Sequence, residues 1–334
     1  MGLDAAALPA RSQPAAAARG EVVIERAAPA GALRAELLDW LDDGLRGGRR
    51  GRLLAEYGPL LEEPGAAHHV VCRIAGEPVS HVLWRVAEAR AGGVALPVGM
   101  LGLVYTDPRA RGRGLAGRAL RAALEEIAAR GAVLAALWSE KRDFYARLGF
   151  EAAGVERMLR IDASLCAAAR AALGSRAGLE VSRARPGDGP ALDALYAAKS
   201  ARLARPSGWL ARLAAAPDCE LRVARAQGRV VAYAACGRGD DLQGVVHEWA
   251  GEPDAVLACA SDLLGGRPAL LMLAGPELEA PVRALRVVGA EELRGSLALI
   301  RVLDPARLPG GLEALSASDP RAGWPLFLWG FDSI

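Results

Sequence analysis

Residues 98–117 constrain this chain more than any other stretch. The apolar run Met100–Tyr105 is typical of a buried strand, because it is short and ends at Asp107-Pro108. A turn rich in arginine and glycine follows, and apolar residues then recur at helical spacing from Ala116 to Ile127. A strand that enters a helix through glycines directs several backbone N–H groups and the positive helix end at one point. The sequence therefore predicts a pyrophosphate site.

Two well-known phosphate loops can be compared with this stretch. A Walker loop requires Gly-Lys-Ser/Thr, but the only lysines are Lys141 and Lys199, neither of them in the turn. The spacing Gly112-x-Gly114-x-x-Gly117 does satisfy the dinucleotide-binding fingerprint, with Glu140 near its acidic position. That fingerprint belongs in a βαβ unit close to the end of its strand, whereas the preceding segments here have the pattern of a hairpin. The dinucleotide interpretation ranks second.

The turn resembles motif A of the GCN5-related N-acetyltransferase (GNAT) superfamily, Arg/Gln-x-x-Gly-x-Gly/Ala. The matching residues are Arg111-Gly112-Arg113-Gly114-Leu115-Ala116, and an overlapping register that starts at Arg109 also fits. The first register is preferred because it places the last small residue at the start of the helix. The resemblance implies that this loop binds the pyrophosphate of acetyl-CoA.

A second signature of the same family follows about thirty residues downstream. Phe144–Glu151 is similar to the family's Tyr-x-x-Leu-Gly-Phe segment, and a buried-strand run, residues 132–138, precedes it. The order of strand, phosphate loop, helix, strand and Tyr-x-x-Leu-Gly-Phe is far more specific than any one piece. It decides against the dinucleotide interpretation and implies an α/β fold with a mixed sheet.

Composition narrows the class of protein. At 334 residues the chain is long enough for two domains, and a net charge of +2 gives no general attraction to nucleic acid or membranes. Five scattered cysteines without a C-x-x-C pair fit reduced thiols in a cytoplasm, and the histidines have no metal-ligand spacing. No apolar run is long enough for a membrane span. Residues 1–20, rich in Ala and Pro, are expected to be a disordered tail.

The rest of the chain divides into two similar halves. Residues 21–162 contain the acetyltransferase pattern, including a hairpin around residues 69–86, and residues 150–161 are expected to supply its last strands. Residues 163–178 are expected to form a connecting helix. Residues 179–304 repeat several landmarks, because residues 223–230 echo the hairpin and Val288-Gly289 echoes Leu148-Gly149. A tandem arrangement of two acetyltransferase folds is therefore expected.

The second half lacks the residues that the family uses. The acidic Gly251-Glu252-Pro253-Asp254 stands where the arginine–glycine loop would be, and Leu285 stands in the place of Tyr145. Because these carboxylates repel phosphate, the second unit is expected not to bind the cofactor.

The C-terminal segment, residues 305–334, carries several aromatic side chains. Pro325, Phe327, Trp329 and Phe331 fall on alternate positions, which predicts a buried or half-buried strand. The segment is expected to pack between the two units.

The family resemblance also implies roles in acetyl transfer. The backbone amides of Val104, Tyr105 and Thr106 would contact the pantetheine and acetyl groups. Tyr145 would be the general acid, since a phenol of pKa ~10 keeps its proton at neutral pH and can protonate a thiolate of pKa ~8.5.

The general base is less defined. Glu140 ends the strand that precedes Tyr145 and is one candidate. The tandem arrangement also resembles the enhanced-intracellular-survival family of acetyltransferases, in which the terminal carboxylate lies in the active site. By that resemblance the carboxylate of Ile334 is a second candidate, and Asp332 is a third. This chain is shorter than those proteins, and a third, sterol-carrier-like domain is not evident.

The sequence thus predicts an acetyl-CoA-dependent N-acetyltransferase that needs no metal and acts on a small-molecule or peptide amine. An aminoglycoside or protein-lysine acetyltransferase of the survival-protein type is an alternative within enzymes. A CoA-binding sensor or assembly module without turnover is the alternative from another class. An intact Tyr145 beside an intact loop argues against a pure binder, which needs no proton donor. Neither the acceptor amine nor the oligomeric state follows from the sequence.

Overall fold

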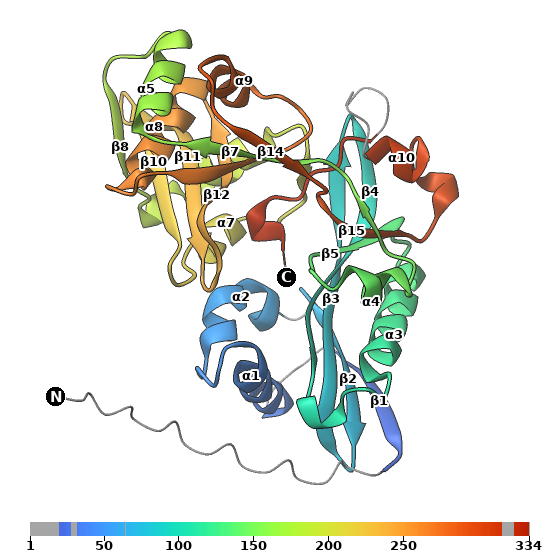
Figure 1. Cartoon of the computed structure of the whole chain (residues 1–334). Helices are drawn as coiled ribbons and strands as arrows, with labels where there is room; N and C mark the ends of the chain where they lie inside the picture. Colours follow the sequence, from blue (N-terminus) through green and yellow to red (C-terminus); the bar gives the residue numbers. More distant parts are fainter. Residues whose placement is uncertain (1–19, 28–31, 64, 316–323, 334) are drawn as a thin grey trace, which may run out of the picture.

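The computed structural model describes residues 20–27, 32–63, 65–315 and 324–333. These residues form two mixed β-sheets with helices packed on them, and a short C-terminal segment lies between the two halves (Figure 1). No helix in the described part of the chain is long and apolar enough to cross a membrane.

The first sheet has the strand order β1-β2-β3-β4-β5-β15-β6, and the short β9 (Arg202–Leu203) pairs with β3. Strands β4 and β5 run parallel, whereas the other neighbouring strands in this order run antiparallel. The strands are β1 (Val22–Ala27), β2 (His68–Ile74), β3 (Glu77–Ala91), β4 (Val94–Thr106), β5 (Leu134–Leu137), β6 (Glu151–Ala153) and β15 (Ala298–Val302).

The second sheet repeats this arrangement in the order β8-β10-β11-β12-β13-β7-β14, again with one parallel pair, β12 and β13. Its strands are β7 (Glu156–Ile161), β8 (Leu179–Arg183), β10 (Glu220–Ala226), β11 (Arg229–Arg238), β12 (Asp241–Gly251), β13 (Leu270–Ala274) and β14 (Glu292–Gly295). The match between the two orders confirms the expected tandem fold.

Each half of the chain supplies one strand to the sheet of the other half. Strand β7 follows β6 in the chain but pairs with β13 and β14 in the second sheet, while β15 follows β14 but pairs with β5 and β6 in the first. The expectation that residues 150–161 complete the first sheet is therefore right for β6 and wrong for β7. Because the sheets are equivalent, local sequence does not specify which of them receives the strand.

The hairpin turns also repeat. Ala75 and Gly76 join β2 to β3 with φ of 52° and 87°, and Gln227 and Gly228 join β10 to β11 with φ of 49° and 77°. Two successive positive φ angles give a turn whose twist matches that of paired strands. This confirms the two hairpins predicted from sequence.

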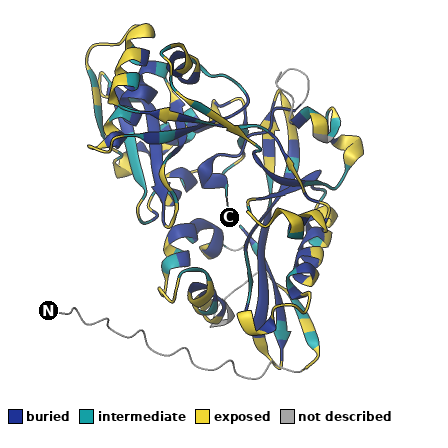
Figure 2. Cartoon of the chain, viewed as in Figure 1, coloured by how far each residue is buried: buried dark blue, intermediate teal, exposed yellow. Residues whose placement is uncertain are grey.

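Helices cover both faces of the first sheet. Leu120, Leu124 and Ile127 of α3 pack with Val82 of β3, whereas the neighbouring Leu83 packs with α1 and α2 on the opposite face. The helices are α1 (Ala32–Leu45), α2 (Arg52–Glu62), α3 (Leu115–Ala129), α4 (Arg142–Ala146), α5 (Ala163–Ala172), α6 (Gly189–Ala197), α7 (Trp209–Leu213), α8 (Pro253–Leu264), α9 (Ala280–Val287) and α10 (Gly311–Leu315). One hydrophobic cluster includes α1, α2, this face of the first sheet, the second unit and the C-terminal segment (Figure 2).

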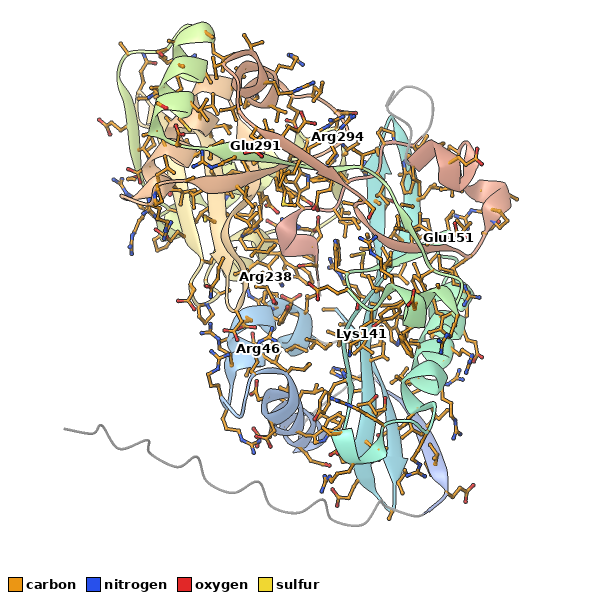
Figure 3. All side chains as sticks on the ribbon, viewed as in Figure 1. Arg46, Lys141, Glu151, Arg238, Glu291 and Arg294 are labelled. Atoms are coloured by element: carbon orange, nitrogen blue, oxygen red, sulfur yellow. The ribbon has the colours of Figure 1, made fainter. Side chains whose placement is uncertain are left out.

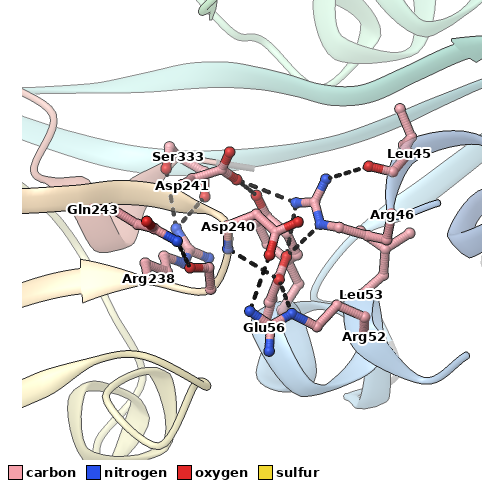
Figure 4. Close-up of polar contacts among 12 residues, drawn as sticks. Leu45, Arg46, Arg52, Leu53, Glu56, Arg238, Asp240, Asp241, Gln243 and Ser333 are labelled. Carbon is pink, nitrogen blue, oxygen red and sulfur yellow. Dashed lines mark hydrogen bonds and ion pairs between the residues drawn. The ribbon is translucent and has the colours of Figure 1, made fainter. Parts of the chain in front are cut away.

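A polar cluster joins α2 to the β11–β12 hairpin of the second unit (Figure 4). Glu56 is 1% exposed and pairs with Arg46 and Arg52, at 2.7 Å in each case. The backbone N–H of Asp240 donates to Glu56 Oε1 at 3.3 Å, and Tyr57 Oη donates to Asp241 at 3.0 Å. Since α1 and α2 are continuous with the first unit, these bonds fix the second unit against them.

The C-terminal segment is buried but is not a strand. Residues 324–332 are all buried, and they run without ladder pairing into the 3₁₀ turn η4 (Gly330–Asp332). The predicted alternation is wrong because the segment packs on both units, so both of its sides are covered. Trp329 Nε1 donates to Ala201 O of the second unit at 3.0 Å, while Trp324 Nε1 donates to Val94 O of β4 at 3.4 Å.

We expect Leu326→Ala to lower the free energy of unfolding by about 2–5 kcal/mol, because it opens a cavity at a side chain that is 1% exposed. The matched control Leu293→Ala removes a leucine that is 51% exposed and should change stability by less than about 0.5 kcal/mol. Urea denaturation of both variants tests this. Equal stability of the two would show that the segment does not contribute to the core.

Candidate active site

The site begins where two parallel strands separate. Strands β4 and β5 pair only from Val98 to Met100 of β4, and the rest of β4 pairs with β3 alone. A register shift opposite β3 places a bulge in β4, and Leu103 there has a φ of 44°. A bulge bends its strand away from the ladder. The result is an opening beside the C-terminal half of β4.

A cleft of about 550 Å³ occupies this opening. It is lined by the end of α1, the end of β4, the arginine–glycine loop, the start of α3, and α4 with its flanking residues. Of the residues predicted from sequence, those that line the cleft are Val104, Tyr105, Thr106, Arg111, Gly112, Gly114, Leu115, Ala116 and Tyr145. Segments about forty residues apart in the chain thus meet as expected. Arg113 is exposed and is not part of this lining.

The loop has the backbone geometry of an anion cradle. Gly112 and Gly114 have φ of 76° and 69°, and a Cβ atom at either would meet no atom within 4 Å. These positions require glycine for conformation and leave the backbone open to the cleft. Arg118 N–H makes the first helical bond, to Gly114 O, so the amides of Leu115 and Ala116 precede the helical ladder of α3. Such amides, with the helix dipole, favour an anion.

The two candidate arginine registers differ in the structure. Arg109 is held by Asp107, with Nη2 2.7 Å and Nε 3.0 Å from its carboxylate, and this ion pair lowers the pKa of Asp107. Arg111 lines the cleft, and Nε donates to Thr106 O at 3.3 Å. Arg111 is therefore available to a ligand, which favours the register that begins there.

Tyr145 is 5% exposed and lies on α4, facing the cleft. The ring of Phe150 packs edge-on against it at 5.9 Å. Burial raises the pKa of Tyr145, while a hydrogen bond with the Ser139 side chain opposes this rise. The phenol therefore stays protonated at neutral pH, as a proton donor must.

The exchanged strand helps to hold α4. Arg301 of β15 donates from Nη1 to Leu148 O, at the end of this helix, at 2.8 Å. Gly149, with a φ of 78°, ends the turn beside the Arg301 side chain. The position of Tyr145 thus depends on a residue about 150 positions further along the chain.

Sequence reasoning missed the contribution of α1. Gly44 and Leu45 line the cleft, and a Cβ atom at Gly44 would lie 2.2 Å from the ring of Tyr105. Trp40 also packs edge-on against Tyr105, at 4.9 Å. The sequence did contain one indication of this contact, because a glycine such as Gly44 inside an apolar helical pattern can mark a place where the helix packs closely against another residue.

The proposed bases differ in location. Glu140 is exposed and is not among the residues that line the cleft, although its neighbour Lys141 is. Asp332 is fully buried, where Arg205 Nε donates to it at 2.8 Å and Trp329 N–H at 2.9 Å. Its bonds therefore hold the C-terminal segment in place. Ile334 lies outside the described residues.

The equivalent position in the second unit is also a hollow of about 550 Å³, but two carboxylates, Glu252 and Glu279, line it. Glu252 is the N-cap of α8 and pairs with Arg176 at 2.7 Å, while Asp254 accepts from the Arg176 backbone N–H at 3.0 Å. The start of α8 thus presents carboxylates and their partner Arg176 in place of an arginine–glycine loop, and it stays a prediction that this unit does not bind the cofactor.

Aromatic side chains occupy the gap between β12 and β13. These strands pair only at Val245 and Val246 of β12, and Trp249 Nε1 then donates across the gap to Leu273 O at 2.7 Å. Trp329 packs edge-on against Trp249 at 5.4 Å, and the Lys199 ammonium lies 4.1 and 3.9 Å from the two ring centres. The C-terminal segment therefore packs beside the gap between these strands and helps to fill it.

Comparison with known proteins agrees with this geometry. Residues 52–153 match the family model described as an acetyltransferase (GNAT) domain. This range runs from α2 through the loop and Tyr145 to β6. The chain therefore contains a GNAT acetyltransferase domain in its first half, built into a tandem GNAT fold. No curated protein sequence matched the chain.

Solved structures resemble almost the whole chain. A probable N-acyltransferase from Enterococcus faecalis is 14% identical with a TM-score of 0.64, over 86% of this chain and 75% of the other. A GCN5-related N-acetyltransferase from Kribbella flavida is 19% identical with a TM-score of 0.60, over 86% and 74%. Eis1 from Mycobacterium abscessus is 19% identical with a TM-score of 0.55, over 84% and 74%. At these identities the likeness establishes the fold.

Acetyl-CoA should bind once per chain, at the loop of the first unit, because the second hollow is lined by Glu252 and Glu279 and has no arginine–glycine loop. We expect calorimetric titration to give one site and Arg111→Gln to weaken it by about tenfold, as one charge-assisted contact is lost. The matched control Arg109→Gln removes a guanidinium bound to Asp107 and should leave the affinity nearly unchanged. Two equivalent sites would contradict the exclusion of phosphate by the carboxylates of the second unit.

Proposed function

We propose that this protein is an acetyl-CoA-dependent N-acetyltransferase that acetylates a primary amine by direct attack. The observation that supports this most is that a glycine–arginine anion cradle and a buried, protonated tyrosine face the same cleft. The first would hold the cofactor's pyrophosphate, and the second would supply the proton that the departing thiolate needs.

The residues divide the work along the cleft. Arg111 and the amides at the start of α3 would bind the phosphates, and the end of β4 would receive the pantetheine arm. Acetyl-CoA supplies the acetyl thioester, and the acceptor nitrogen attacks its carbonyl carbon as the carbon–sulfur bond breaks. Tyr145 donates its phenolic proton to sulfur, and Phe150 and Arg301 keep α4 in position for this. Glu140 and the carboxylate of Ile334 remain candidates for removing the amine proton.

We expect Tyr145→Phe to lower kcat by about 10²–10⁴-fold and to leave acetyl-CoA affinity nearly unchanged, because the proton is needed only as the bond breaks. Thiol release with acetyl-CoA and a panel of amines measures kcat, and calorimetry measures binding. Normal turnover by the variant would disprove the acid role. Binding of acetyl-CoA without thiol release by the wild type would instead favour a sensor module.

The pH dependence gives a separate check. Burial raises the pKa of Tyr145, so the acid form should persist up to the ordinary tyrosine value of ~10, and activity should fall only above it. Ser139→Ala removes a hydrogen bond that favours the phenolate, so the alkaline fall should move to higher pH. An unchanged or lower alkaline limb in Ser139→Ala would show that Tyr145 does not set it.

A further inference from the structure

The cleft is cationic in a molecule where most buried charges are paired. Its lining includes Arg111, Lys141 and Arg147, and it includes no carboxylate among the described residues. Within the same part of the chain, no carboxylate lies within ion-pair distance of any of these three side chains. Several buried arginines elsewhere are neutralised, as Arg205 is by Glu248 and Asp332, each at 2.7 Å, although Arg85 and Arg238 bond to backbone oxygens instead.

Two of the three cations, Arg111 and Arg147, are placed to bind the phosphates of the cofactor. Arg111 is part of the phosphate loop. Arg147 follows α4 and also lines a neighbouring hollow of about 750 Å³ along the outer face of α3, with Arg121 and Arg301. Both lie where the phosphate-bearing part of the cofactor would run along α3.

Lys141 stands at the other end of α4. It is the N-cap residue of this helix, four positions before Tyr145, and shares the cleft with Gly44 and Leu45 of α1. Figure 3 shows it in the middle of the molecule, between α1–α2 and α3. A cation at a helix N-terminus opposes the helix dipole, so this position is not explained by helix stability.

The second unit carries the opposite charge at the equivalent place. Glu279 is the N-cap of α9, the helix that corresponds to α4, and it pairs with Lys199 at 3.0 Å. In the second unit this position therefore serves an internal ion pair. In the first unit its counterpart is a lysine without such a partner, in the lining of the cleft.

We infer that Lys141 is a specificity-determining residue, and that the acceptor is an amine that also carries an oxyanion, either a carboxylate or a phosphate. This inference rests on the proposed acetyl transfer and identifies its acceptor class. The amine nitrogen lies at the thioester beside Tyr145, and the oxyanion pairs with the Lys141 ammonium. A polycationic acceptor meets a like charge here and is disfavoured.

The test compares acceptors that differ only in the anion. Glycine is paired with glycinamide and phosphoethanolamine with ethanolamine, at equal concentrations of the neutral amine. Wild-type kcat/KM should favour an anionic member by about tenfold, and Lys141→Met should abolish that preference. Lys141→Glu should favour the neutral members. Preference for glycine identifies a carboxylate, and preference for phosphoethanolamine identifies a phosphate.

Arg142→Met is the matched control, because Arg142 is an exposed cation next in the chain that does not line the cleft. It should keep the anion preference. Calorimetric binding of acetyl-CoA to Lys141→Met should match the wild type. Weakened cofactor binding with an unchanged acceptor preference would assign Lys141 to the cofactor phosphates and overturn the inference.

The acceptor inference and the proposed function fail differently. Acetylation of these amines without preference for the anion refutes the acceptor class and leaves the transferase intact. Absence of thiol release with every amine refutes the transferase. The acceptor class is then judged by calorimetric binding of glycine and phosphoethanolamine to the CoA-loaded protein, and binding that Lys141→Glu does not weaken, or no binding at all, overturns it.

Discussion

The reciprocal exchange of β7 and β15 is the constraint on which the rest of this structure depends. Each sheet has its sixth strand supplied by the other half, paired on both sides, so neither sheet has a complete ladder without its partner. A buried strand that lost its place would leave its backbone donors and acceptors without partners. The two units are therefore expected to fold together, although the sequence consists of two similar halves. The exchange also affects the candidate active site, since Arg301 of β15 binds the end of α4, the helix that carries Tyr145.

A parallel pair that separates leaves backbone groups and apolar surface facing an opening, and the two units treat that opening differently. In the second unit the Trp249 indole donates across it to Leu273 O, Trp329 packs beside this indole, and Arg176 pairs with Glu252 at the start of α8. The hollow that remains there is lined by carboxylates, whereas the glycines of the first cleft leave the loop backbone uncovered. The repeat thus explains the aromatic-rich C-terminal segment, because its side chains pack where the second pair of strands separates.

Local chemistry was predictable from sequence, and long-range pairing was not. The loop at Gly112 and Gly114 and the turn at Ala75-Gly76 each depend on residues a few positions apart, so their patterns were sufficient. The destination of β7 was not, because two equivalent sheets offer it the same edge. Alternate aromatics after Trp324 predicted a strand, yet the segment is covered on both sides, and period-two patterning carries no information there. Gly44 was missed because its partner, Tyr105, is about sixty residues away.

The charge contrast between the two openings follows from the same physical argument. Charged side chains that are buried need partners, since a buried ion without one is strongly unfavourable. Lys199 is accordingly matched by Glu279, and Arg205 by Glu248 and Asp332. An open cleft can keep unmatched charge because water solvates it until a ligand arrives. The three cations of the first cleft therefore require a surface that stays accessible to water, and their shared positive charge indicates an anionic ligand. The proposed cofactor phosphates account for the two arginines along α3. Lys141, beside Tyr145, is the cation that we infer to bind an anionic group of the acceptor.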